Sequence, residues 1–170
     1  MRLIQTYYAD LLNGEGLRDV YFFAGCTHHC SQCFSPETWD PEMSESKLWL
    51  PEDFEKMIEC ASKDYISGIT LTGGDPFFSL NREGILDLCK EFKQRLPEKT
   101  IWLYTGYTWE AIEKDKDARW ECLEYIDVLC DGPFIESLKS PSKPWVGSEN
   151  QRVIDVQKSL SENKIILYDK

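Results

Sequence analysis

Short apolar runs alternate with amphipathic segments along the chain of 170 residues. Runs rich in β-branched and aromatic residues, each bounded by polar or turn-forming residues, predict strands. They cover residues 19–24, 66–71, 100–104, 126–130 and 152–156. Apolar residues recur at helical spacing over residues 51–63 and 81–96, and a third helix is expected after Thr108. Strands that alternate with helices are typical of βαβ units, so the sequence predicts an α/β fold with a mostly parallel sheet.

The length of the chain limits how this sheet is completed. It is close to that of one ordinary domain, so we expect residues 1–170 to form a single domain. About five strands are too few for a closed eight-stranded barrel of about 250 residues, which leaves an open doubly wound sheet or a partial barrel. In either case we expect ligands at the carboxyl ends of the strands. Residues 137–150 lack periodicity and are rich in Ser, Pro and Lys, which predicts a surface loop.

Charge and composition exclude several kinds of partner. The chain has 19 basic and 30 acidic residues, and this net charge of −11 repels nucleic-acid backbones and anionic membranes. It has no run of the roughly 18 apolar residues that a membrane helix needs, and its amino terminus does not resemble a secretory signal. We therefore expect a cytoplasmic protein that binds neither nucleic acid nor membrane. Its seven cysteines are an odd number, which favours reduced thiols and metal ligands over a disulfide framework.

Three cysteines lie close together, directly after the first predicted strand. Cys26, Cys30 and Cys33 have CxxxCxxC spacing. Three thiolates can each bind one iron of a [4Fe–4S] cluster, and the fourth iron then has no protein ligand. A structural zinc ion is the alternative, with His28 or His29 as a fourth ligand.

The remaining cysteines fall at apolar positions of predicted helices or at the end of a predicted strand, and we interpret them as core residues. They are Cys60, Cys89, Cys122 and Cys130. A fourth cluster ligand from among them is left open as an alternative.

A glycine-rich turn follows the second predicted strand. Residues 70–77 read TLTGGDPF, and Gly73 and Gly74 allow a ligand to approach the backbone without interference from a Cβ atom. An ordinary strand-to-helix turn has the same composition. Because this turn and the cysteine loop both follow parallel strands, we expect them at the same edge of the sheet.

Taken together, these motifs resemble the radical S-adenosylmethionine (radical SAM) superfamily. Within it the chain is similar to the family of proteins that activate the anaerobic ribonucleoside-triphosphate reductase. Besides LTGGDPF, the segments that carry the resemblance are residues 14–40, 102–109, 127–136 and 147–156. The resemblance implies a shortened radical SAM fold, a partial (β/α) barrel of about six mostly parallel strands.

The resemblance also implies a reaction. Cys26, Cys30 and Cys33 would be both the metal ligands and the catalytic residues, because S-adenosylmethionine would chelate the iron that they leave open. Its reductive cleavage would give a 5′-deoxyadenosyl radical, which removes a hydrogen atom from a glycine of the reductase. A reduced flavodoxin-like protein would be the electron donor. The alternatives are another short radical SAM enzyme, of the pyruvate formate-lyase activase or deazapurine synthase type, and a non-catalytic iron or zinc scaffold.

Residue by residue, the resemblance places the methionine amino group at the glycine turn and the adenine beside residues 32–34. Gln32 departs from the aromatic residue that many radical SAM proteins have before the last cysteine. Gly106 and Gly132 would face the same cavity. The implied cofactor-binding residues are Gln32, Cys33, Phe34, Gly73, Gly74, Asp75, Thr105 and Asp131.

Four further residues are interpreted without the resemblance. His28 and His29 are expected to be loop residues hydrogen-bonded to the backbone. Arg18 either pairs with a carboxylate or is solvated. Trp145 lies in the predicted surface loop with little local structure to bury it, so we expect it to contact a partner protein.

Overall fold

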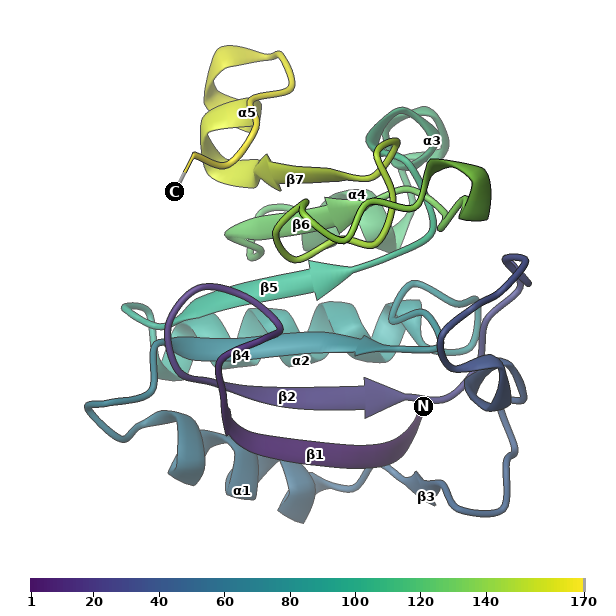
Figure 1. The fold of residues 1–170 in the computed structure, drawn as a ribbon. Coiled ribbons are helices and arrows are strands. Elements are labelled where there is room, and N and C mark those ends of the chain that lie inside the picture. The colour runs from purple at the N-terminus through teal and green to yellow at the C-terminus, as the bar shows by residue number, and fades with distance from the viewer. Residues whose placement is uncertain (170) are drawn as a thin grey trace.

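A computed structural model of the chain describes residues 1–169, so the domain boundary expected at Lys170 lies outside the described residues. One sheet runs through this part of the chain in the order β3-β1-β2-β4-β5-β6-β7 (Figure 1). Its strands are β1 (Arg2–Asp10), β2 (Arg18–Phe23), β3 (Lys47–Leu48), β4 (Gly68–Gly73), β5 (Thr100–Tyr104), β6 (Val128–Asp131) and β7 (Arg152–Asp155). The central strands β2, β4, β5 and β6 are parallel, and β1 and β7 flank them in antiparallel orientation. The predicted α/β class and the mostly parallel centre of the sheet are confirmed.

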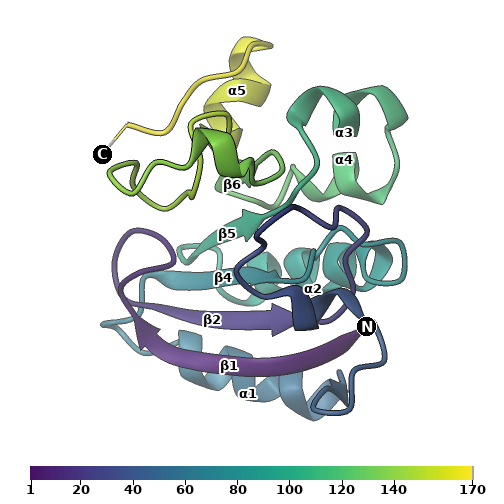
Figure 2. The same cartoon turned by 45° about the vertical axis from the view of Figure 1, so that its right-hand side comes forward.

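Helices fill the connections between these strands. They are α1 (Pro51–Ala61), α2 (Arg82–Arg95), α3 (Trp109–Asp115), α4 (Ala118–Cys122) and α5 (Val156–Glu162), with short 3-10 turns η1 (Pro36–Trp39) and η2 (Glu136–Leu138). All of these α-helices contribute side chains to one hydrophobic core, and both views place α1 and α2 behind the strands (Figures 1 and 2). A doubly wound sheet has helices on both faces, so this arrangement differs from it. The sheet is open, with β3 and β7 at its edges.

Helices α1, α2 and α3 form where the sequence predicts them, for recognisable local reasons. Pro51 occupies the first turn of α1, where its missing N–H is not needed. Phe54, Met57, Ile58 and Ala61 recur at helical spacing and are all buried. Burial of each of the three large side chains, Phe54, Met57 and Ile58, contributes about 1.5–3 kcal/mol from the hydrophobic effect.

The elements absent from the sequence-based prediction include the short strand β3 and, more informatively, β1 and α5. Leu3 is the only buried residue of β1, so the strand lacks the apolar pattern that would reveal it. Val156, which we expected to end a strand, is instead the first residue of α5. The Asp155 side chain accepts a hydrogen bond from the Lys158 backbone N–H and so begins the helix.

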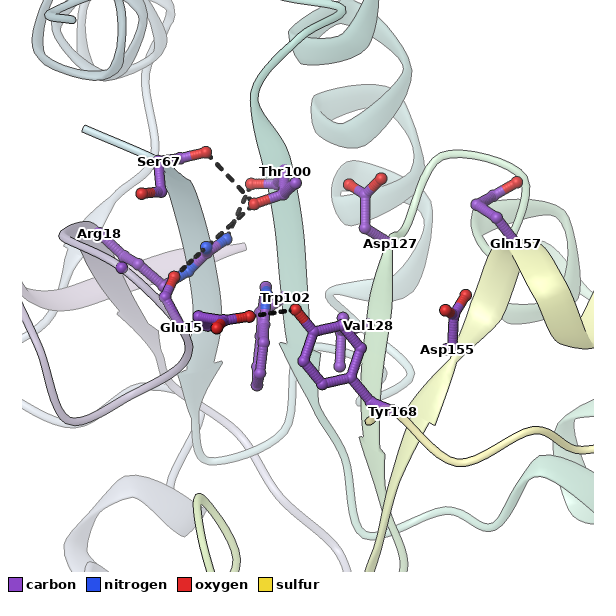
Figure 3. Close-up of a pocket in the computed structure, with 11 residues that line it drawn as sticks. Glu15, Arg18, Ser67, Thr100, Trp102, Asp127, Val128, Asp155, Gln157 and Tyr168 are labelled. Atoms are coloured by element: carbon purple, nitrogen blue, oxygen red, sulfur yellow. Dashed lines mark hydrogen bonds between the residues drawn. The ribbon is translucent and has the colours of Figure 1, made fainter. Parts of the chain in front are cut away.

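At the amino ends of the parallel strands, the Arg18 guanidinium is buried, with an exposed fraction of 1%. Its N–H groups donate to Oγ1 of Thr70 and of Thr100, and to the carbonyls of Glu15, Ile69 and Thr100, at 2.7–3.0 Å. Figure 3 shows Arg18 beside Glu15 and Thr100. Arg18 is therefore neither solvated nor paired with a carboxylate, contrary to both expectations. Because burial disfavours its charged form, the pKa of Arg18 is lowered to about 10.

The face of the sheet opposite the helices carries a second apolar cluster centred on Trp102, Val128 and Cys130. The Trp145 ring packs edge-to-face on Trp102 with ring centroids 4.9 Å apart, and lies 6.0 Å from the ring of Tyr168. Trp145 is therefore half-buried against residues outside its own loop, which removes the reason for expecting a partner contact there. Residues 137–150 are otherwise irregular apart from η2, as predicted.

The cysteines outside the CxxxCxxC motif are buried, which confirms their interpretation as core residues. They are Cys60, Cys89, Cys122 and Cys130, with exposed fractions of 5% or less. Within residues 1–169, no helix is long and apolar enough to cross a membrane.

Candidate metal centre

The cysteine loop leaves the sheet at the carboxyl end of β2. Gly25 adopts a φ of 103°, a left-handed conformation that favours glycine, and turns the chain out of the strand. The Gly25 and Cys26 N–H groups donate to the carbonyls of Thr38 and Trp39, at 2.8 and 3.1 Å. These bonds fix the start of the loop on η1, which follows it in the chain. The cysteine loop therefore begins at the edge where parallel sheets bind ligands.

The cysteines of the motif differ in their surroundings. Cys26 is buried, Cys30 and Cys33 are half-buried, and all three thiols are free. Burial raises the pKa of the Cys26 thiol to about 11, although the backbone N–H groups of His28 and His29 hydrogen-bond its sulfur and oppose this shift. Hydrogen bonds of this kind to cluster sulfurs are one way in which a protein sets a reduction potential.

The glycine turn lies against the start of the cysteine loop. The Gly74 N–H donates to the carbonyl of Phe23, and the Asp75 N–H donates to that of Gly25, both at 2.8 Å. A Cβ atom on Gly74 would lie 2.5 Å from the Gly25 carbonyl oxygen and 2.6 Å from that of Thr38. Both neighbours are backbone, so this close approach requires glycine at position 74.

The Asp75 carboxylate joins the connections that follow β2, β4 and β5. It accepts hydrogen bonds from Thr105 Oγ1 at 2.9 and 3.0 Å, from the Gly106 N–H at 3.0 Å and from the Phe77 N–H at 2.8 Å. Its Oδ2 also lies 2.7 Å from Nε2 of His28. His28 thus contacts a carboxylate, whereas we expected a backbone partner.

A cavity of about 150 Å³ opens where these connections meet. Of the predicted site residues, it is lined by Cys26, Cys30, Cys33, Gly73, Gly74, Thr105, Gly106 and Gly132. Cys130, one of the cysteines left open as a fourth ligand, also lines it, as do residues that sequence reasoning did not select: Tyr104, Pro133, Phe134 and Gln151. Tyr104 and Cys130 occupy the last positions of β5 and β6 that face away from the helices, so strand alternation was the available signal.

Other predicted cofactor-binding residues lie outside this cavity. Phe34 and Gln32 are exposed. Asp131 is fully buried and accepts hydrogen bonds from the Trp109 N–H at 2.7 Å and from Arg152 Nε at 3.0 Å. The Asp75 carboxylate is enclosed by the donors described above. Contacts of these residues with a cofactor stay predictions.

Comparisons with known proteins agree with this geometry. The model of the family described as "4Fe-4S single cluster domain" matches residues 12–154. A relative from Enterobacteria phage T4 is 40% identical over 153 residues, which cover 90% of this chain and 93% of the relative. Relatives from Haemophilus influenzae and Escherichia coli K12 are 38% and 36% identical, over 89% and 90% of this chain and 96% and 97% of their own lengths. All three relatives are called "Anaerobic ribonucleoside-triphosphate reductase-activating protein".

The chain belongs to this family of activating proteins. The resemblance found in the sequence is confirmed, and the family is one of 4Fe-4S single cluster domains. The donor set fits such a cluster, because the three free thiols of the CxxxCxxC motif line one cavity at the edge of the sheet, which Cys130 at the end of β6 also lines. Within residues 1–169, no three His, Cys, Asp or Glu side chains gather as they would around a single ion. A [4Fe–4S] cluster does not require that arrangement, because each thiolate binds a separate iron.

Proposed function

We propose that this protein activates the anaerobic ribonucleoside-triphosphate reductase as a radical SAM oxidoreductase. Cys26, Cys30 and Cys33 hold a [4Fe–4S] cluster, and the iron that they leave free binds S-adenosylmethionine. When bound, these groups supply reductive cleavage of S-adenosylmethionine to a 5′-deoxyadenosyl radical that abstracts a hydrogen atom from a glycine of the reductase. The observation that carries the proposal is the meeting of the three free thiols of the CxxxCxxC motif with the Gly73–Gly74 turn at one cavity.

The residues around the cavity bind S-adenosylmethionine and shield the radical from water. Gly73 and Gly74 present backbone without side chains, so their carbonyls can accept hydrogen bonds from the methionine amino group. The Asp75 carboxylate already has several donors, so its contribution is to hold the turn in place. Tyr104 and Phe134 supply apolar walls that exclude water, which matters because a radical is quenched by stray hydrogen donors.

The wider setting follows from the same proposal. The described sheet is a partial barrel of one shortened radical SAM domain, since its helices share one face and its central strands are parallel. The protein works in the cytoplasm and meets the glycyl-radical subunit of the reductase at the carboxyl edge of the sheet. A reduced flavodoxin-like protein delivers the electron.

Anaerobic reconstitution tests the proposal. We expect about four irons per chain, release of 5′-deoxyadenosine in the presence of a reductant, and a glycyl radical on the added reductase, detected by electron paramagnetic resonance (EPR). Cys26→Ala, Cys30→Ala and Cys33→Ala should each lose all three signals, whereas Cys60→Ala, a buried cysteine outside the cavity, should keep them. A colourless zinc protein, or a reductase without a glycyl radical, overturns the proposal. A radical formed on pyruvate formate-lyase instead identifies the other activase.

A further inference from the structure

The middle of the cysteine loop has few backbone ties to the rest of the protein. Within residues 1–169, no backbone–backbone hydrogen bond joins residues 27–32 to another segment. His29 and Gln32 adopt left-handed conformations, with φ of 45° and 56°, which cost a non-glycine residue about 1 kcal/mol each. Side chains must therefore determine where this part of the loop lies.

His28 provides such a contact from the middle of the loop. Its Nε2 lies 2.7 Å from Oδ2 of Asp75, 47 positions further along the chain, and its side chain is only 17% exposed. The ring packs edge-to-face on Tyr107, with centroids 4.5 Å apart. It also lies directly over Gly106, where a Cβ atom would approach the ring to 2.4 Å. His28 thus occupies a site shaped by the connections after β4 and β5.

The carboxylate that His28 contacts is itself held in place. Asp75 is 1% exposed, and hydrogen bonds from Thr105 Oγ1 and the Gly106 and Phe77 N–H groups orient both of its oxygens. A proton on Nε2 of His28 makes the ring the donor in the remaining contact. The His28–Asp75 bond therefore attaches the middle of the cysteine loop to a carboxylate that is fixed between the connections after β4 and β5.

The position of His28 also affects a predicted cluster ligand directly. The backbone N–H groups of His28 and His29 hydrogen-bond the sulfur of Cys26. If the His28 side chain is released, these donors move with the backbone. Hydrogen bonds to cluster sulfurs influence the reduction potential, and partners that orient metal ligands affect metal affinity.

We propose that His28 is a positioning residue: its bond to Asp75 holds the loop that carries Cys26, Cys30 and Cys33 in the arrangement that receives the cluster. The cluster itself rests on the proposed function above. His28 touches neither iron nor substrate in this role, and acts through the cysteine loop. His29 is the natural comparison, since it stacks on Trp39, with ring centroids 4.6 Å apart, and has no bond to Asp75.

The test compares four variants with the wild type. His28→Ala removes the bond to Asp75, and His28→Asn has an amide too short to reach it, so the pair covers the case in which one variant fails to fold. His28→Gln carries an amide N–H at nearly the position of Nε2 and should restore the bond. His29→Asn is the matched control, because it removes the neighbouring ring and tolerates a positive φ.

Hydrogen exchange in the iron-free protein is the first measurement. We expect the peptide that covers residues 26–33 to exchange about tenfold faster in His28→Ala and His28→Asn, and at the wild-type rate in His28→Gln and His29→Asn. This readout does not depend on a cluster. Unchanged exchange in both loss variants overturns the role of His28.

The reconstituted protein gives the second measurement. We expect His28→Ala and His28→Asn to lose iron to a chelator about tenfold faster than the wild type and to shift the midpoint potential and EPR line shape of the reduced cluster. His28→Gln should return all three toward wild-type values. Loss variants that match the wild type in all three overturn the inference while the proposed function stands. A wild type that takes up no iron overturns the proposed function and, with it, the assignment of His28 to a cluster.

Discussion

Each end of the parallel strands has a buried charged side chain with several hydrogen-bond partners, Arg18 at the amino ends and Asp75 just beyond the carboxyl ends. Every N–H of the Arg18 guanidinium has an acceptor, and those acceptors come from the strands themselves or the loop before β2. Asp75 also gathers several partners, but they belong to connections, including the cysteine loop. A buried charge with many hydrogen bonds therefore joins the strands at one end and positions the loops of a candidate metal centre at the other.

The cavities at the two ends differ in volume and in the groups that line them, and the larger cavity has the less reactive lining. Figure 3 shows the residues that line the amino-end cavity. It is the larger of the two cavities, with about 380 Å³ against about 150 Å³. Its carboxylates already have partners: Asp127 pairs with Lys93 at 2.8 Å and Asp155 with Lys158 at 2.9 Å. The smaller cavity is lined by free thiols and glycine backbone. The reactivity of the lining groups, and not cavity size, separates the candidate site from a structural hollow.

Replacing Arg18 gives the largest expected change in stability and sharpens this comparison. Arg18→Met leaves buried hydroxyl and carbonyl acceptors without a donor, so we expect the free energy of unfolding to fall by about 3–5 kcal/mol. Urea unfolding of the iron-free protein measures it. Arg95→Met is the control, because Arg95 pairs with Glu55 at the surface and should matter by no more than about 1 kcal/mol. A loss below about 1 kcal/mol for Arg18→Met would contradict the structural role.

A substitution in the glycine turn should lower both stability and iron uptake at the carboxyl ends of the strands. Gly74→Ala forces backbone atoms of Gly25 and Thr38 apart, at a cost of about 1–3 kcal/mol, and displaces the start of the cysteine loop. We expect iron uptake to fall together with stability. Gly84→Ala is the control, because its new methyl group meets only the flexible Met1 side chain and alanine favours the helix. Normal iron uptake by Gly74→Ala would show that the turn and the loop are independent.

We expect Trp145, like Arg18, to contribute to stability and not to the reaction. We expect Trp145→Ala to lose about 1–3 kcal/mol of stability, because the ring packs on Trp102 and Tyr168 without being fully buried. Cleavage of S-adenosylmethionine and radical transfer to the reductase should remain at wild-type rates when measured below the unfolding transition. Normal stability with impaired transfer would instead restore Trp145 as a partner contact.

The smallest effect concerns the reactivity of Cys26 in the iron-free protein. Burial raises its pKa to about 11, so at pH 8 only about 0.1% of this thiol is ionised. The rate of alkylation of Cys26 should rise about tenfold for each pH unit up to pH 11. Mass spectrometry of the peptide that contains Cys26 measures this rate. Because the folded pKa exceeds the ordinary value of 9.0, stability linked to this proton is present below pH 9 and is lost as the pH rises toward 11. Urea-unfolded protein is the control, and equal rates in both states would show that the site does not bury Cys26.

The sequence predicted the central fold because its signals are local. The apolar runs of β2, β4, β5 and β6 and the amphipathic faces of α1 and α2 can be read over a few residues. β1 was missed because an antiparallel strand with one buried residue has no such pattern. α5 was missed because its polar sequence owes its helix to the cap at Asp155.

In the candidate site, too, local sequence features were predicted and long-range contacts were not. Spacing identified Cys26, Cys30 and Cys33, and strand order placed the glycine turn beside them. The His28–Asp75 bond joins residues 47 positions apart, and no sequence pattern near either residue predicts that they pair. The burial of Arg18 likewise depends on Thr70 and Thr100, which approach it only in the assembled sheet. Partners fixed by tertiary structure lie beyond what spacing in one sequence can show.

The hydrogen bonds of Arg18 also carry a consequence for synthesis. They reach partners 51, 52 and 82 positions further along the chain. A polypeptide that leaves the ribosome from its amino terminus cannot satisfy this guanidinium until Thr100 has emerged. More than half of the protein must therefore be made before the centre of its sheet can close, and any earlier fragment exposes a charged group that the finished molecule conceals.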